Sequence, residues 1–184
     1  AGIAFFRQGM AAPEFRPLEP GVISVSPLTD NVQKPDALAD AVRSIVTGGA
    51  GRKRRSAVLV LPDYCARVSV LEFDKLPADE KEQHALVKFR MKKTVPFDVE
   101  SPAVSFHSRQ GKGKTDVIVV VAALEIVARY EAPFRAAGLH PGVVTTSALA
   151  ITELNREPGV SIVARLNGRT LSVIVMRDGG PRLV

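Results

Sequence analysis

Residues 67–98 read RVSVLEFDKLPADEKEQHALVKFRMKKTVPFD, which is the pattern of a strand followed by a helix with an abrupt end. Alternating apolar residues predict a strand at 68–73. Acidic residues open the helix and basic residues close it, as the helix dipole favours. Pro96 cannot continue a helix, and it biases Val95 towards an extended backbone. The stretch therefore predicts a small α/β unit with an apolar exit at Pro96 and Phe97.

A predicted hairpin and a second helix complete this unit. Residues 103–109 and 116–123 have strand patterns, and the sequence QGKGK at 110–114 joins them. The Gly-Lys-Gly-Lys run lacks a following Ser or Thr and precedes a strand, so we interpret it as a hairpin turn and not as a phosphate loop. Apolar residues at helical spacing then predict a helix at 126–137 that Gly138 ends.

The flanking sequence predicts further strands and helices around the unit. Residues 56–61 form a continuous apolar run, which predicts a strand buried on both faces. Asn167-Gly168 between two apolar runs predicts a hairpin of 161–166 with 171–176. The other predicted elements are strands at 3–6, 14–17 and 143–145, a helix from Pro35 that Gly48 stops, and a short helix at 147–154 capped by Thr145 or Thr146.

Composition limits the class of protein. The chain has 184 residues, of which 46% are hydrophobic, enough for a globular core in one large domain or two small ones. No apolar run approaches the roughly 18 residues that span a bilayer, and the first residues lack a signal-peptide pattern. The net charge of +6 is spread along the chain except at 52–55, and the chain has no Trp, so we expect no specific nucleic-acid partner.

Residue types that carry catalysis are not grouped in the sequence. Cys65 is the one cysteine, which fits a cytoplasmic setting, and we interpret it as a small buried apolar group. His84, His107 and His140 have no Cys or carboxylate at ligand spacing, so we predict no metal site. No Ser-His-Asp or paired-carboxylate arrangement is present, and we therefore predict no catalytic residues and no enzyme.

An ordered set of motifs resembles the PilM family of type IV pilus assembly proteins, which belong with the cell-division protein FtsA in the actin-like superfamily. The motifs are PGVI at 20–23, PDALA at 35–39, AVLVLPD at 57–63, VPFDVE at 95–100, DVIVVVA at 116–122, AAGL at 136–139 and SALA at 147–150.

The resemblance implies an α/β fold: an actin-like (ribonuclease H-like) subdomain with an inserted small α+β subdomain of the FtsA/PilM type. It implies a first part at 1–64, the insert at 65–140, a return to the first subdomain at 141–158 and the start of a second actin-like subdomain at 159–184. The first strand of such proteins carries an Asp-x-Gly phosphate loop, which would lie before Ala1. We accordingly expect the chain to be the N-terminal half of a larger protein. The C-terminal half of that protein would be truncated at Val184.

The resemblance also implies a second phosphate hairpin, at 163–172. Arg165, Asn167, Gly168 and Thr170 take its nucleotide-binding positions. Arg165 stands where the family has Asp or Asn, and Asn167 stands where it has Gly; a register shift by one residue would restore an Asn-Gly loop. Because Arg cannot orient a magnesium-bound water as a carboxylate does, we expect no cofactor, and we leave ATP with Mg²⁺ open for a full-length protein. We likewise leave open whether such a full-length protein has ATPase activity.

Partner binding is the function that the resemblance implies. In PilM proteins a groove beside the insert accepts the cytoplasmic N-terminal tail of the membrane protein PilN. The candidate partner-binding residues are Phe89, Arg90, Lys93, Pro96 and Phe97, with the alternative that Phe89 and Phe97 belong to the core.

We accordingly predict a cytoplasmic scaffold, peripheral to the inner membrane, that docks a PilN-like tail together with pilus or secretion motor components. Self-association is left open. The alternatives are the cytoplasmic domain of a GspL-like type II secretion protein, which would continue into a membrane span, and a nucleotide-binding actin-like ATPase.

Overall fold

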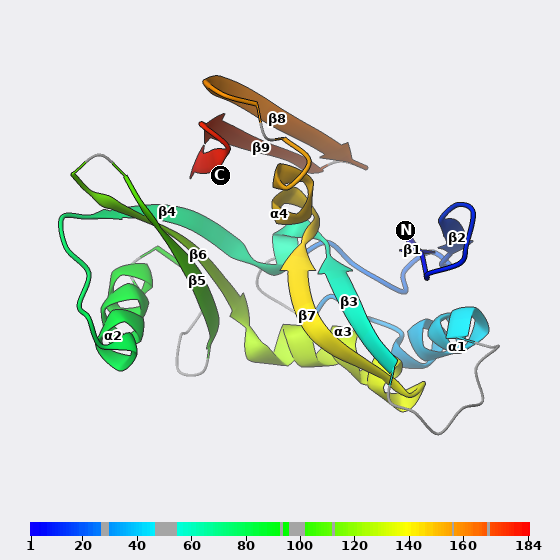
Figure 1. The fold of residues 1–184 in the computed structure, drawn as a ribbon. Helices are drawn as coiled ribbons and strands as arrows, with labels where there is room; N and C mark the ends of the chain where they lie inside the picture. The colour runs from blue at the N-terminus through cyan, green and yellow to red at the C-terminus, as the bar shows by residue number, and fades with distance from the viewer. Residues whose placement is uncertain are drawn as a thin grey trace. The chain divides into compact units, whose positions relative to one another are not determined.

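The structure is a computed structural model that describes residues 1–26, 30–46, 55–92, 94–95, 102–111, 113–155, 157–168 and 170–184 (Figure 1). Contacts divide it into two compact units, Ala1–Leu59 with Glu125–Val144 and Val60–Leu124 with Thr145–Val184. We describe each unit by itself. The subdomain boundaries implied by the resemblance stay a prediction.

Short sheets and two helices make up the first unit. Its elements, some of which extend beyond it, are β1 (Gly2–Phe5), β2 (Glu14–Pro17), α1 (Pro35–Val46), β3 (Arg55–Leu61), α3 (Leu124–Ala136) and β7 (Leu139–Thr146). Strands β1 and β2 pair antiparallel, and β3 pairs with β7. Leu38 and Val42 lie one turn apart on α1 and are buried, as the helical spacing predicts.

The prediction that residues 56–61 are buried on both faces is wrong. Val58 is 65% exposed and Val60 is 49% exposed. The physical reason is that β3 belongs to a two-stranded sheet, so its continuous apolar run does not sit between two covered faces.

The second unit contains two three-stranded antiparallel sheets, ordered β4-β6-β5 and β10-β9-β8. Its further elements are the short 3₁₀ turn η1 (Asp63–Cys65), β4 (Arg67–Phe73), α2 (Glu80–Met91), β5 (Pro102–Gln110), β6 (Thr115–Ala123), α4 (Ser147–Thr152), β8 (Val160–Asn167), β9 (Thr170–Arg177) and β10 (Gly180–Leu183). The predicted hairpin of β5 with β6 is confirmed, with Gln110 opposite Thr115.

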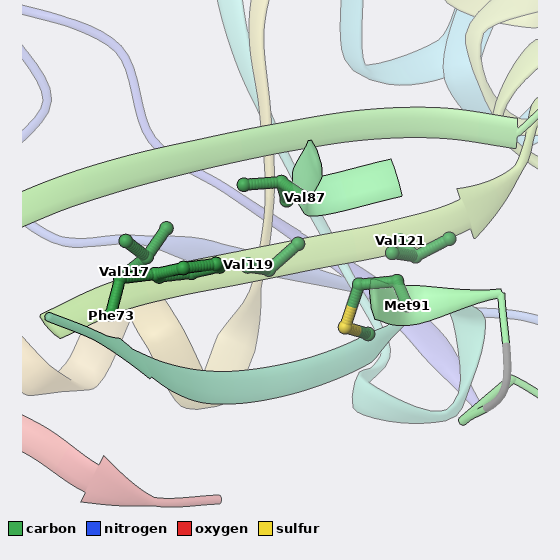
Figure 2. Packing of buried hydrophobic residues seen from close by; sticks show 6 residues of the cluster. All are labelled: Phe73, Val87, Met91, Val117, Val119 and Val121. Atoms are coloured by element: carbon green, nitrogen blue, oxygen red, sulfur yellow. The ribbon is translucent and has the colours of Figure 1, made fainter. Parts of the chain in front are cut away.

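Helix α2 covers one face of the β4-β6-β5 sheet and forms its core (Figure 2). The buried cluster consists of Phe73, Val87, Met91, Val117, Val119 and Val121. Alternate residues of β6 point to this face, while Val87 and Met91 are one helical turn apart and point back at them. Asp79 begins the helix by accepting a hydrogen bond from the Glu82 N–H at 3.0 Å.

Helix α4 packs against the inner face of the β8–β9 hairpin. Ala148 forms a small buried cluster with Ile174 and Met176 of β9. Thr146 caps the helix, as predicted, with its hydroxyl oxygen 3.5 Å from the Leu149 N–H. The hairpin is also confirmed: Asn167 lies opposite Thr170, and Gly168 adopts a positive φ of 60°, a conformation that glycine accepts without steric cost.

Candidate functional site

The carboxylate of Asp63 is the polar centre of the second unit. Pro62 interrupts the end of β3, and Asp63 follows as the first residue of the 3₁₀ turn η1. Its side chain is only 13% exposed. A carboxylate this buried needs hydrogen-bond donors on both oxygens, because an unpaired buried charge is strongly unfavourable.

Helix α4 supplies two of these donors. Asp63 Oδ1 accepts a hydrogen bond from the Ser147 hydroxyl at 2.8 Å and another from the Ala148 N–H at 2.6 Å. These groups belong to the first turn of α4, whose N–H groups have no partner within the helix. Asp63 therefore caps α4 from 84 residues away in the sequence, in addition to the local cap by Thr146.

The β8–β9 hairpin supplies the other two donors. Asp63 Oδ2 accepts a hydrogen bond from the Ser172 hydroxyl at 2.5 Å and pairs with Arg165 Nη1 at 3.4 Å. Arg165 and Ser172 are cross-strand partners, so their side chains emerge on the same inner face of the hairpin. One carboxylate thus fastens the hairpin and the start of α4 to the end of β3. We call this set of contacts the Asp63 clasp.

The residues predicted to bind nucleotide lie on the β8–β9 hairpin, and the clasp engages one of them, Arg165. Arg165 is turned inward and paired, whereas Asn167 and Gly168 lie exposed at the tip of the hairpin. Thr170 is half-buried and lines a pocket of about 250 Å³ together with Asp63, Ser172 and Thr146. The four predicted residues share one hairpin, but only Arg165 and Thr170 are partly buried beside the clasp, while Asn167 and Gly168 are exposed at its tip.

This arrangement disfavours a phosphate group at the inner face of the hairpin. The Asp63 carboxylate carries the same sign of charge as a phosphate and lies at the wall of the pocket. The Arg165 guanidinium, which could have paired with phosphate, is already paired with Asp63. Arg165 also cannot orient a magnesium-bound water, because a guanidinium has no acceptor oxygen.

Two of the predicted partner-binding residues lie on α2. Phe89 is 64% exposed, so the alternative that it belongs to the core is wrong. The Arg90 guanidinium lies 5.5 Å from the centre of the Phe73 ring, within the range of a cation–π contact. Lys93, Pro96 and Phe97 lie outside the described residues. The helix therefore presents one exposed aromatic side chain next to a cation.

Sequence reasoning gave no role to Asp63. The available signal was an acidic residue one position after the end of an apolar run, in LVLPD at 59–63. Cys65, interpreted as a buried apolar group, is 3% exposed. Within the described ranges no group of His, Cys, Asp and Glu side chains could hold a metal ion, and no helix is long and apolar enough to cross a membrane.

Comparison with known proteins identifies the fold. No protein-family profile matches the chain, and no curated protein sequence does. Among solved structures, the chain is similar to the cytoplasmic domain of EpsL, an inner-membrane component of the type II secretion system of Vibrio cholerae, with a TM-score of 0.54 and 19% identity. The match covers 84% of this chain and 58% of the EpsL chain.

At this identity the similarity concerns the fold alone: it supports the predicted α/β class, and the actin-like assignment stays a prediction. The chain spans somewhat more than half of the EpsL domain that it matches. The more specific prediction, a PilM-type protein with an inserted FtsA/PilM-type subdomain, is not decided by it.

We expect Asp63→Ala to lower the free energy of unfolding by about 2–4 kcal/mol, because it removes a helix cap and leaves Arg165 and Ser172 without their acceptor. Urea unfolding measures this loss. Asp40→Ala is the matched control, since Asp40 forms an exposed ion pair with Arg43 and should cost about 0–1 kcal/mol. Equal losses in the two variants would contradict the clasp.

Proposed function

We propose that this chain is the actin-like cytoplasmic part of an inner-membrane component of a bacterial type II secretion system. The observation that carries the proposal is the similarity of its fold to the cytoplasmic domain of EpsL over 84% of the chain. In this role the chain is a scaffold that holds other proteins of the secretion machinery, and it reaches the membrane through those partners or through a further part of its own protein.

The Asp63 clasp supports a scaffold over an ATPase. In the proposed role the β8–β9 hairpin has lost the task of holding phosphates and serves as a structural element. Arg165 and Ser172 bind Asp63 from neighbouring strands at 3.4 Å and 2.5 Å, contacts that replace those a nucleotide would make. Binding of partner proteins needs no nucleotide, and the chain would work as a non-enzymatic component.

A second candidate is a PilM-like scaffold of type IV pilus assembly that docks a PilN-like tail. The observation that favours it is the exposure of Phe89, which is 64% accessible on α2 beside Arg90. An exposed aromatic side chain next to a cation suits the capture of a short peptide with apolar and acidic residues. Both candidates use α2 as a contact surface, so one variant serves to test both.

We expect ATP with Mg²⁺ to show no binding tighter than about 1 mM to the intact protein in isothermal titration calorimetry. The physical reason is that Asp63 repels phosphate and occupies Arg165. A micromolar Kd that Arg165→Ala weakens and Arg16→Ala leaves unchanged would contradict the proposal, because Arg165 would then be a phosphate ligand. A gain of ATP affinity in Arg165→Asp would instead support the interpretation that the arginine closes a former phosphate loop.

We expect deletion of the gene in its native host to stop the export of type II secreted proteins and to leave type IV pili intact. Loss of pili with normal secretion would favour the second candidate, and no change in either process would contradict both. Complementation with Phe89→Asp should fail, because it places a charge in the exposed apolar contact on α2. Phe15→Asp is the matched control, since Phe15 is exposed to 65% on β2 and belongs to the other unit.

A further inference from the structure

A second polar pocket, of about 630 Å³, lies within the second unit at the β5–β6 turn and the β9–β10 turn. Its lining is almost entirely charged: Arg109, Lys114, Arg177 and Arg182 carry positive charge, and Glu72, Asp116 and Asp178 carry negative charge. Neither the resemblance nor the similarity to EpsL assigns a role to this place. The kind of ligand that this pocket can bind depends on which of these charged side chains form ion pairs with one another.

Two of the three carboxylates are paired with cations across the pocket. Arg182 of β10 forms an ion pair with the buried Asp116 of β6. Lys114 Nζ lies 3.3 Å from a carboxylate oxygen of Glu72. These contacts remove most of the repulsion that Asp116 and Glu72 would exert on an anion.

The third carboxylate has a backbone partner. Asp178 Oδ1 accepts a hydrogen bond from the Gly159 N–H at 3.0 Å, and the Asp178 N–H donates to the Gly159 carbonyl at 2.8 Å. Asp178 adopts a φ of 51°, a left-handed conformation that Asp tolerates better than most residues. The turn therefore holds the Asp178 side chain towards β8.

Arg109 is held in place without losing its charge. Its Nη2 donates to the Asp178 backbone carbonyl at 2.8 Å, which is a neutral acceptor. Its side chain also lies against Gly180, where an added Cβ would clash with Arg109 Nη1. Glycine at this position is what allows the guanidinium to rest on the backbone. Within the described ranges Arg109 has no carboxylate partner.

Arg177 supplies the second uncompensated charge. It is exposed at the end of β9, and no ion pair joins it to another residue of the described chain. Two guanidinium groups without a carboxylate partner among the described residues thus line one pocket, together with the Asp178 carboxylate, which accepts a hydrogen bond from the Gly159 N–H. A guanidinium presents a planar fork of N–H donors, which matches the oxygens of phosphate.

From this arrangement we infer that the pocket binds a phosphate-type oxyanion between Arg109 and Arg177. The two guanidinium groups outnumber the Asp178 carboxylate and leave a net positive charge, and the several oxygens of a phosphate can accept hydrogen bonds from both guanidinium groups at once. The site is separate from the Asp63 clasp and does not depend on the proposed scaffold role. The oxyanion is either a soluble phosphate compound or the headgroup of an anionic phospholipid.

The test is titration of the intact protein with inorganic pyrophosphate at constant ionic strength, and in parallel with vesicles of phosphatidylglycerol. Arg177→Gln should weaken binding about tenfold, since it removes one charge-assisted contact from an exposed and unpaired side chain. Arg16→Gln is the matched control, because it removes the same charge from an exposed position on β2. Binding of pyrophosphate identifies a soluble source, and binding of vesicles alone identifies the headgroup.

Gly180→Ala tests the geometry at unchanged net charge. Its methyl group forces the Arg109 guanidinium away from the backbone, so binding should again weaken about tenfold. Gly142→Ala is the control, because a Cβ there meets no atom within 4 Å. Absence of binding to both probes, or binding that Arg177→Gln and Gly180→Ala leave as strong as the controls do, would overturn the inference.

Discussion

The hydrogen bonds of the Asp63 carboxylate are the interaction on which the second unit depends. Four donors from two separate parts of the chain reach its two oxygens, between 2.5 and 3.4 Å. Removal of the carboxylate would leave α4 with only its local cap by Thr146 and a half-buried arginine without its partner. The clasp therefore holds parts of the second unit together, and it also engages the two side chains of the β8–β9 hairpin that face Asp63.

In the proposed function, the same interaction is the reason to favour a scaffold over an enzyme. A phosphate hairpin needs open backbone N–H groups and a side chain that orients the metal-bound water. Here the side chains of the inner face, Arg165 and Ser172, are already engaged by Asp63. Phe89 on α2 stays exposed, and the proposed function uses this face for contact with other proteins.

Local sequence patterns were sufficient to predict most helices and strands. They were not sufficient to predict which face of each helix or strand is buried. The hairpin of β5 with β6 could be predicted because alternation and turn residues are local signals. The sequence alone does not determine the apolar face of α2, since Leu86, Val87, Phe89 and Met91 fit two overlapping stripes. In the structure Val87 and Met91, one turn apart, pack against the sheet. Phe89 lies on the opposite side of the helix and is exposed. Exposure of Val58 and Val60 likewise depends on how many strands join β3.

The candidate site was the least accessible from the sequence. Arg165 could be recognised as a departure from the phosphate hairpin, but the partner of Arg165 lies 102 residues earlier. No periodicity or spacing rule connects residues at that distance, and Asp63 alone looks like an ordinary acidic residue after a strand. The oxyanion pocket is hidden for the same reason: Arg109, Arg177 and Gly180 come together only through packing of two hairpins.

A double-mutant cycle between Asp63 and Arg165 tests the central claim most directly. The free energy of unfolding would be measured by urea denaturation for the original protein, Asp63→Ala, Arg165→Ala and the double variant. The clasp predicts a coupling free energy of at least about 1 kcal/mol, because either substitution removes the same contact. A coupling free energy near zero would show that Arg165 does not depend on Asp63, and it would contradict the account of a hairpin closed by its own arginine.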